Sequence, residues 1–334
     1  MFKLLTIFIG LLSVFGKISA VSAETTAPTR PQFAMPIDCK LGETCWIANY
    51  VDVDPTSGVK DFKCNDKSYD GHKGVDFALK SRSAMNKGVN VLAAMDGKVL
   101  RVRGGENDDP KTKEEYDAIT QANKDCGNGI ILDHGLGVQS FYCHLKNGSI
   151  AVKPGQSVKE GDILGQVGQS GFAEFPHLHF TALWEGGHVD PFTGMLKEDG
   201  CGKVKQSLWK DDIPYAPYAL FDAGFAGKVP DFKALNEGGQ RPQEPNLTSK
   251  AFVFWVSLYQ MQKGSQVTLR ITDPEGKTFI NREITQDKNR ARQHYYTGRK
   301  LRDRTLKSGT YSASVTLKAK GYEPHTQEFT IDIQ

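Results

Sequence analysis

The sequence predicts an all-β protein built from antiparallel strands and divided into two domains. Between residues 155 and 168, glycine turns separate short runs of Val, Ile and Leu, which is typical of short antiparallel strands. After residue 251, apolar and polar residues alternate in further short stretches, as they do in half-buried strands. The 334 residues are enough for two separate hydrophobic cores.

Strand signals of the first domain begin before residue 155. The apolar runs at residues 91–94 and 98–102 predict two strands. The segments around Ile131 and Phe141 predict two more, which we expect to pair as a hairpin across a turn at residues 135–137. Together these elements favour an antiparallel sheet or sandwich.

The second domain is predicted at residues 251–334. Its expected strands cover residues 252–259, 266–272, 279–284, 311–317 and 328–333. Roughly 85 residues of short alternating strands fit an immunoglobulin-like sandwich. Residues 203–250 contain Pro214, Pro217 and Pro230 and the Gly- and Pro-rich stretch 238–245, so we expect a connector there.

The first 23 residues predict a secretory signal peptide. Lys3 precedes an apolar run at residues 4–15, and Val21-Ser22-Ala23 provides small residues for cleavage after Ala23. The run is shorter than the roughly 20 residues that span a bilayer. We therefore expect an exported protein of the periplasm or the extracellular space, which meets the membrane only through its signal peptide, with residues 24–48 as an N-terminal segment.

Six cysteines follow the predicted signal peptide: Cys39, Cys45, Cys64, Cys126, Cys143 and Cys201. An even number in an oxidising compartment predicts disulfides. Pairing of the strands around Ile131 and Phe141 would bring Cys126 close to Cys143. We expect Cys39 with Cys45 as the next pair, which leaves Cys64 with Cys201.

Three short strings carry the residues for chemistry: Gly71-His72-Lys73-Gly74-Val75-Asp76, Tyr142-Cys143-His144-Leu145 and Pro176-His177-Leu178-His179-Phe180. In an extended strand, residues two and four apart share a face. His72 and Asp76 would then point together, with Gly74 between them leaving room for an ion. By the same rule His177 and His179 point together. A single His-x-His is a weak signal, but three such strings in one chain predict a metal site.

The four histidines and one aspartate of these strings suit a hydrolytic zinc site. Zinc binds neutral imidazole nitrogen and carboxylate oxygen, and a catalytic site keeps three protein ligands and one open position. Five candidate groups for three ligand positions leave two histidines for proton transfer. Cys143 would point away from His144 and is not expected to bind. Among the other histidines, His134 is expected at a hairpin turn, His188 in a loop, and His294 and His325 on the surface.

Residues 49–202 resemble the lysostaphin/LytM-type zinc endopeptidases of peptidoglycan, which have the duplicated-hybrid-motif fold. Besides the three strings above, the resemblance rests on residues 127–135 and 158–168. It implies that His72, Asp76 and His179 bind one zinc ion, while His144 and His177 act on the bound water and the scissile carbonyl. All five positions carry the expected residue, which favours an active enzyme. The alternative is a non-catalytic murein-binding regulator of another cell-wall hydrolase.

The sequence departs from this family in three places. Residues 104–126 form a charged insertion, in which Pro110 after Asp108-Asp109 predicts a helix over residues 111–122. The helix would either line the substrate groove or decorate the surface, and decoration is slightly favoured. Phe175-Pro176 replaces the family's small Ser/Thr-Gly lead-in to the His-x-His string, and six cysteines are more than such domains usually carry.

The substrate and partners are only partly constrained. D-alanyl–diaminopimelate links and glycine-rich bridges are both cut within the family; no residue discriminates between them, and the short signal peptide weakly favours the first. Residues 250–334 carry 15 Lys and Arg against 8 Asp and Glu. This region includes a basic cluster, which indicates either an anionic envelope polymer or acidic protein as partner or a solvated loop: Lys288, Arg290, Arg292, Arg299, Lys300, Arg302 and Arg304. A net charge of only +3 on an exported chain argues against nucleic acid. A lipoyl-type carrier, suggested by residues 158–165, would leave the histidines unexplained and is rejected.

Overall fold

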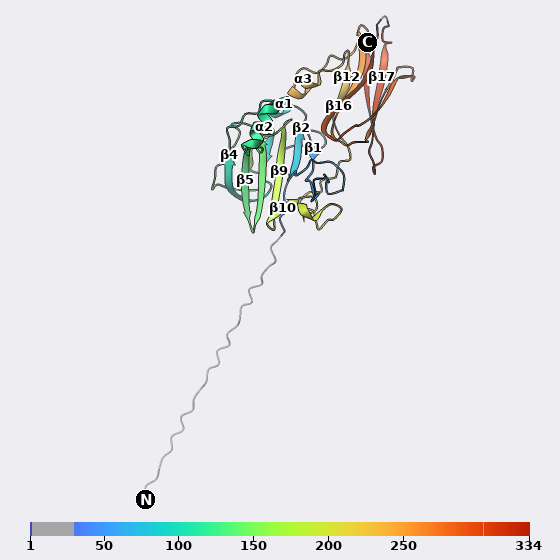
Figure 1. Cartoon of the computed structure of the whole chain (residues 1–334). Helices are drawn as coiled ribbons and strands as arrows, with labels where there is room; N and C mark the ends of the chain where they lie inside the picture. Colours follow the sequence, from blue (N-terminus) through green and yellow to red (C-terminus); the bar gives the residue numbers. More distant parts are fainter. Residues whose placement is uncertain (2–29, 303) are drawn as a thin grey trace. The chain divides into compact units, whose positions relative to one another are not determined.

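The structure is a computed structural model that describes Met1, residues 30–302 and residues 304–334 (Figure 1). The predicted signal peptide, apart from Met1, lies outside the described residues. Residues Pro31–Gln334 form one compact unit. Within the described part of the chain, every helix is too short or too polar to cross a membrane.

A nine-stranded antiparallel sheet forms the first half of this unit, and it confirms the predicted all-β fold. Its strands run in the order β1-β2-β9-β6-β5-β4-β7, with β10 and β11 beside β9. Their bounds are β1 (Cys45–Asn49), β2 (Val75–Leu79), β4 (Gly97–Arg103), β5 (Asn128–Gly135), β6 (Val138–Leu145), β7 (Ser157–Val158), β9 (His177–Trp184), β10 (Gly187–Asp190) and β11 (Met195–Leu196). A separate pair joins β3 (Asn90–Leu92) to β8 (Ile163–Gln166).

The alternation of side chains along β2 and β9 separates the core from the site. Phe77 on β2 and Phe180 on β9 are fully buried in the main core, where Trp209 packs against both rings. Residues at the intervening positions, such as Asp76 and His179, point to the other face. The apolar period therefore fixes the direction in which the polar side chains project.

In the described part of the chain, four short helical segments accompany the sheets: α1 (Arg82–Lys87), α2 (Lys113–Gln121), η1 (Lys197–Asp199) and α3 (Phe232–Glu237). The predicted helix in the insertion is α2, but it starts later than expected. Thr112 accepts a hydrogen bond from Glu115 N, and the Glu115 carboxylate accepts one from Thr112 N. This reciprocal cap sets the first turn, so Pro110 lies outside the helix.

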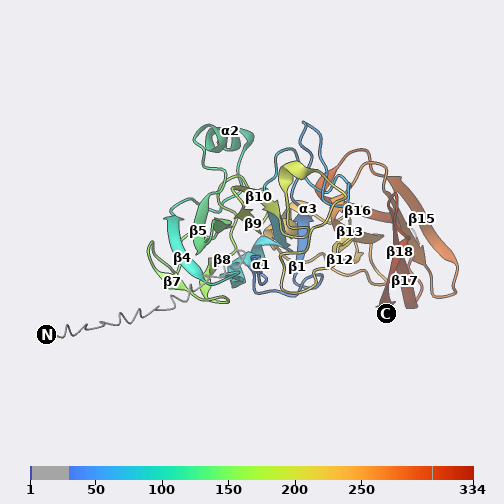
Figure 2. The same cartoon turned by 90° about the horizontal axis from the view of Figure 1, so that it is seen from below.

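Two sheets form the C-terminal half of the unit (Figure 2). One joins β12 (Ala219–Ala226), β13 (Ala251–Met261) and β16 (Arg290–Lys300); the other runs β15 (Thr278–Thr285), β14 (Gln266–Thr272), β17 (Gly309–Lys318) and β18 (His325–Ile333). Phe254, Leu269 and Val315 contribute to one buried core between them. The five predicted strands are all present, and the immunoglobulin-like assignment of this sandwich stays a prediction.

Two strands of the sandwich were not expected. β12 lies inside the predicted connector and pairs with β13 along its length. Burial of Phe221 and Phe225 holds it there. The strand was not predicted because Ala and Gly between these residues have low strand propensity. β16 contains much of the basic cluster and is a strand, so the solvated-loop interpretation is wrong there. Its Tyr295 and Thr297 are buried while Tyr296 between them is exposed, which is the alternation of a half-buried strand.

The N-terminal boundary also differs from the prediction, because β1 begins at Cys45, within the expected N-terminal segment 24–48.

All three predicted disulfides are present: Cys39–Cys45, Cys64–Cys201 and Cys126–Cys143. The expected hairpin is also confirmed, since Ile131 on β5 lies opposite Phe141 on β6. Pairing of β5 with β6 therefore brings Cys126 and Cys143 together, as predicted. Because Cys143 is in a disulfide, its sulfur is not available as a metal ligand.

The sandwich packs directly on the strands that lead to the site. Trp46, Ala78 and Phe175 from the first half share a buried cluster with Phe221 and Tyr259 from the second. The Tyr259 hydroxyl donates to Leu79 O at 2.7 Å, at the end of β2. This small apolar cluster and the hydrogen bond from Tyr259 connect β13 with β2, the strand that carries Asp76.

Candidate metal centre

Three side-chain atoms converge on one point in a manner suited to a metal ion. His72 Nε2 lies 3.1 Å from Asp76 Oδ1 and 3.0 Å from His179 Nδ1. His179 Nδ1 lies 2.9 Å from Asp76 Oδ1. Within the described residues these three form a group that could hold a metal ion.

Paired strands position two of the three groups. Asp76 on β2 lies directly opposite His179 on β9 in the antiparallel register. His72, expected on the same strand as Asp76, lies instead in the loop before β2. Asp52 holds that loop: its backbone N donates to His72 O at 2.9 Å, and its Oδ2 accepts from Gly71 N at 2.9 Å.

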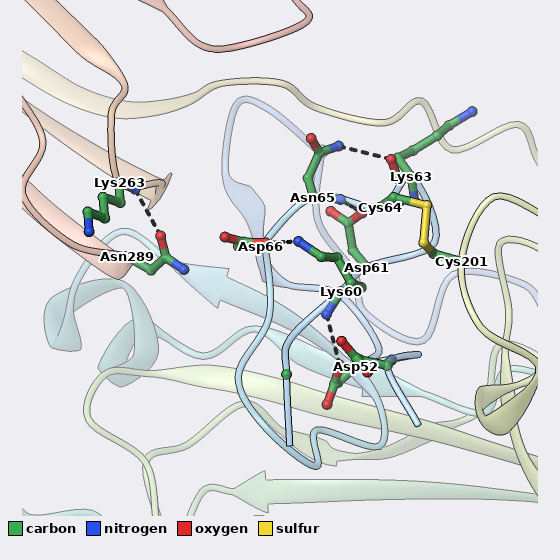
Figure 3. Close-up of polar contacts among 12 residues, drawn as sticks. Asp52, Lys60, Asp61, Lys63, Cys64, Asn65, Asp66, Cys201, Lys263 and Asn289 are labelled. Carbon is green, nitrogen blue, oxygen red and sulfur yellow. Dashed lines mark hydrogen bonds and ion pairs between the residues drawn. A yellow bond between two sulfur atoms is a disulfide. The ribbon is translucent and has the colours of Figure 1, made fainter. Parts of the chain in front are cut away.

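Figure 3 shows how the neighbouring loop is fastened. Asp61 Oδ1 accepts hydrogen bonds of 2.9 Å from the backbone N atoms of Lys63 and Asn65, and the Cys64–Cys201 disulfide lies beside it. Lys60 N donates to Asp52 Oδ1 at 3.0 Å. The loop that presents His72 therefore depends on a carboxylate network rather than on strand pairing.

Gly74 is needed for a different reason from the one expected. A Cβ on this residue would lie 2.4 Å from Phe180 O and 2.8 Å from His179 Nε2. The space beside Gly74 is therefore occupied by β9 and the His179 ring, and it is not room for an ion. Glycine here permits the close approach that brings His179 next to Asp76.

Each candidate ligand has a second hydrogen-bond partner that fixes its orientation. His72 Nδ1 donates to Tyr50 O at 2.7 Å, Asn49 Nδ2 donates to Asp76 Oδ2 at 2.8 Å, and His179 Nε2 is 2.8 Å from Thr181 Oγ1. Such partners are the usual support of metal ligands. None of these three partners was predicted from the sequence, although Thr181 lies two residues after His179 and so shares its face.

The donor set fits a small cation. A carbonyl oxygen only accepts, so the proton of a neutral His72 ring is on Nδ1 and its Nε2 presents a lone pair. That lone pair faces the Asp76 carboxylate and a second imidazole at about 3 Å, an arrangement that a cation stabilises. Ligands of a tetrahedral zinc ion at 2.0–2.1 Å would be about 3.3 Å apart, close to the spacing found here.

His144 and His177 adjoin this centre. Their ring centroids are 4.5 Å apart, and the His144 ring lies 5.9 Å from that of His179. Their Nδ1 atoms donate to Ser170 O and Phe175 O, both at 2.8 Å. Each ring is thereby held with Nε2 free for other partners, and His177 Nε2 lies 3.7 Å from Asp76 Oδ1. The structure therefore brings all five predicted site residues together.

The backbone at His144 departs from a regular strand. Its φ is +62°, in the region that non-glycine residues seldom adopt. Gly168 N donates to His144 O at 3.0 Å, and His144 N donates to Cys126 O at 2.8 Å. These bonds and the adjacent Cys126–Cys143 disulfide hold a conformation of a kind that is concentrated at functional sites.

Burial and charge set the protonation of the site. Burial alone would raise the pKa of the Asp76 carboxyl, but the charges of His72 and His177 and hydrogen bonds from His179 and His72 hold that pKa well below its usual range. Burial, followed by the charges of His177 and His179, holds the pKa of His144 well below its usual value. Burial also lowers the pKa of His179. The lowered pKa values favour an anionic Asp76 carboxylate and a neutral His179 ring, the forms in which these groups bind zinc.

A hollow of about 550 Å³ opens beside His144 and His179. Thr120 of α2 and the half-exposed rings of Tyr69 and Phe172 line it. The Tyr116 ring of α2 lies 4.7 Å from Phe172, and its hydroxyl donates to Ala173 O at 3.0 Å. The insertion therefore contributes to one wall of the hollow, which favours a role beside the site over surface decoration.

The remaining histidines lie outside this centre. His134 is at the end of β5, where Asp96 O and Ser140 Oγ bind its ring at 2.7 Å. His188 lies on β10 rather than in a loop. His294 is half-buried rather than fully exposed: its ring stacks on Phe232 with centroids 4.6 Å apart and bonds Ser257 Oγ at 2.7 Å. His325 is exposed, as expected.

Comparison with known proteins places this region in a family. Residues 70–191 match the profile described as Peptidase family M23. This segment is an M23 peptidase domain. The resemblance to lysostaphin/LytM-type endopeptidases is thereby confirmed for the part of the chain that holds the five site residues.

Known relatives of the M23 domain include peptidoglycan DD-endopeptidase ShyB of Vibrio cholerae, 33% identical over 119 residues, which are 36% of this chain and 22% of that protein. Glycyl-glycine endopeptidase ALE-1 of Staphylococcus capitis is 34% identical over 113 residues, 34% of this chain and 24% of that protein. The chain thus spans no more than about a quarter of the length of these two relatives. The solved catalytic domain of lysostaphin from Staphylococcus simulans has 25% identity and a TM-score of 0.27, over 43% of this chain and 85% of that one.

Proposed function

We propose that this chain is an exported zinc endopeptidase that hydrolyses peptide cross-links of peptidoglycan. The observation that carries the proposal is the convergence of His72, Asp76 and His179 around one point, with His144 and His177 beside it. The M23 match supports peptidase chemistry, and relatives named as peptidoglycan endopeptidases support the substrate class. Action on peptidoglycan requires a place outside the cytoplasm, which agrees with the predicted signal peptide.

His72 Nε2, Asp76 Oδ1 and His179 Nδ1 would hold the zinc ion. When bound, zinc lowers the pKa of water at its open position from 15.7 to about 7 and polarises the scissile carbonyl. Tyr50 O, the Asn49 amide and Thr181 Oγ1 keep the three ligands in orientation. These second partners reduce the reorganisation needed during reaction.

His144 and His177 would manage the proton and the developing negative charge. Both rings carry a proton on Nδ1, so in the neutral state Nε2 of either accepts a proton from the attacking water. Return of that proton to the departing nitrogen completes hydrolysis of the amide to a carboxylate and an amine. General base catalysis of this kind contributes about 10²–10⁴ in rate. The other imidazole, once protonated, donates to the oxyanion.

Digestion of purified murein tests the proposal. The zinc-loaded chain should convert cross-linked muropeptides to monomers, and mass spectrometry of the products would identify the cleaved bond. His144→Ala, which leaves the three ligands intact, is the matched control and should be inactive. Binding of murein without any cleavage by the wild-type chain would instead favour the alternative, a regulator of another hydrolase.

The C-terminal sandwich is proposed to bind an anionic envelope polymer or an acidic protein. A hollow of about 650 Å³ on its surface is lined by Arg299, Lys300 and Arg304. Cosedimentation with an anionic wall polymer should weaken as salt is raised, because exposed charges are screened. Equal binding by a variant with all three residues changed to Gln would contradict this role.

A further inference from the structure

Two opposite charges line the hollow beside the candidate metal centre. Lys73 follows the ligand His72, and Asp125 lies near the end of the insertion, directly before Cys126. Both side chains are exposed to solvent. Tyr69 and Phe172 line the same hollow, and the two rings are 52% and 45% exposed, so the hollow also offers apolar surface to a ligand.

The fold does not neutralise either charge. Among residues 30–302 and 304–334, no hydrogen bond or ion pair binds the Lys73 ammonium group. The Asp125 carboxylate accepts one side-chain hydrogen bond, from Thr120 Oγ1 to Oδ1 at 2.8 Å. By contrast, nearby charges of the same insertion are paired, such as Lys124 with Glu106 at 2.7 Å. Lys73 and Asp125 therefore remain available to a ligand.

Asp125 is held in place by its neighbours. Its backbone O accepts from Phe172 N at 2.8 Å, and the adjacent Cys126 is bonded to Cys143, the residue before His144. Lys73 is placed by the loop that presents His72. Both charges thus belong to segments whose positions relative to the centre are fixed, which is a requirement for a specific subsite.

The two candidate substrate classes differ in charge next to the scissile bond. In a D-alanyl–diaminopimelate link, the carbon bonded to the scissile nitrogen carries a free carboxylate. The diaminopimelate of the donor stem keeps a free ammonium group on the other side of the bond. A glycine bridge offers only neutral backbone at the corresponding positions.

We propose that Lys73 binds the carboxylate next to the scissile nitrogen and Asp125 binds the ammonium group of the donor stem. The hollow then selects charged diaminopimelate cross-links over neutral glycine bridges. This inference rests on the proposed peptidoglycan endopeptidase function and adds the substrate class. Charge complementarity of this kind gives specificity more than raw affinity, and charge-assisted hydrogen bonds supply the directional part.

The test compares two dimeric muropeptides that differ in one group. One has the free diaminopimelate carboxylate next to the scissile bond, and in the other this carboxylate is amidated. For the wild-type chain, amidation should lower kcat/KM about tenfold, which corresponds to about 1.4 kcal/mol. For Lys73→Met, the two dimers should be cleaved at nearly the same, lower rate. Lys320→Met, which removes an exposed charge from the sandwich, should behave as wild type.

A parallel pair of substrates tests Asp125. Acetylation of the donor ammonium group should lower kcat/KM several-fold for the wild-type chain and have little effect on Asp125→Asn. Asp332→Asn is the matched control, because Asp332 is also exposed and also accepts from a threonine hydroxyl, that of Thr310 at 2.5 Å. Zinc content and melting temperature, measured for every variant, should remain those of wild type.

Equal cleavage of free and amidated dimers by the wild-type chain would overturn the inference and leave the proposed function standing. Faster cleavage of a pentaglycine peptide than of the charged dimer would also overturn the inference and leave the proposed endopeptidase function standing. If the wild-type chain cleaves neither class, the proposed function fails. In that case the affinities of the two dimers, measured by calorimetry with the same variants, still decide whether Lys73 recognises the carboxylate.

Discussion

The M23 half and the C-terminal sandwich are both built from antiparallel strands, but different interactions hold them in place. All three disulfides lie between Cys39 and Cys201, and β1 and β2 are only five residues long. The sandwich after residue 250 contains no cysteine, and β13 and β16 each extend over 11 residues. Long ladders over one core stabilise the sandwich, whereas the site depends on loops and strand ends that need covalent and polar anchors.

Removal of the disulfide next to His144 should have the largest effect of the changes considered, on both the stability and the activity of the M23 half. Cys126→Ser with Cys143→Ser opens a link between residues 17 apart, which should lower the free energy of unfolding by about 3 kcal/mol. It should also lower kcat, because Cys143 precedes the strained His144. Urea unfolding and muropeptide kinetics measure the two effects.

The matched control is Cys39→Ser with Cys45→Ser, which opens a link between residues only 6 apart and far from His144 along the chain. This variant should lose stability but keep its kcat. Equal losses of kcat in both double variants would show that the Cys126–Cys143 link has no special relation to the site.

Acid should weaken the sandwich through His294. Burial, then the charge of Arg292, lowers the pKa of His294 to about 4, while the charge of Asp222 opposes this. Since the unfolded chain takes up this proton near pH 6.5 and the folded chain only near pH 4, stability falls as the pH drops between these values. The loss should reach about 2 kcal/mol, because solvent reaches part of the ring and reduces the full value of about 3 kcal/mol.

Urea unfolding at pH 7 and pH 4.5 measures this effect. His294→Gln keeps a polar group near Ser257 but cannot titrate, so its stability should depend less on pH than that of wild type. The same pH dependence in both proteins would mean that other groups cause the acid sensitivity of the sandwich.

The hairpin around Ile131 and Phe141 and the Cys126–Cys143 pair could be predicted because both depend on local alternation and a short turn. The other two disulfide pairs were reached by sequence proximity and by elimination, and the grouping of the five candidate site residues was implied by the family resemblance. The sequence could not predict what depends on distant contacts. Gly74 permits the approach of β9, which lies about 100 residues away in the sequence. His294 is covered by Phe232 from a segment expected to be a connector. β16 was not predicted because its arginines interrupt the apolar alternation in the sequence, and the strand face is evident only from the burial of Tyr295 and Thr297.

The contact between the two halves should be modest in energy. Tyr259→Phe removes the hydrogen bond to Leu79 O and leaves a buried carbonyl without this donor, which should cost about 1 kcal/mol. Tyr311→Phe is the control, since its hydroxyl accepts from Lys307 N within the sandwich. The first variant should lower the thermal stability of the M23 half and the second should not. Identical effects on both halves would indicate that they unfold as one cooperative unit.

Metal analysis of two variants tests the central claim most directly. The wild-type chain and His144→Ala should each contain about one zinc ion, although His144→Ala loses about 10²–10⁴ in kcat. Asp76→Ala should contain almost none, because it removes the carboxylate that both His72 and His179 contact. Stoichiometric zinc in Asp76→Ala would contradict the assignment of the metal centre to these three side chains.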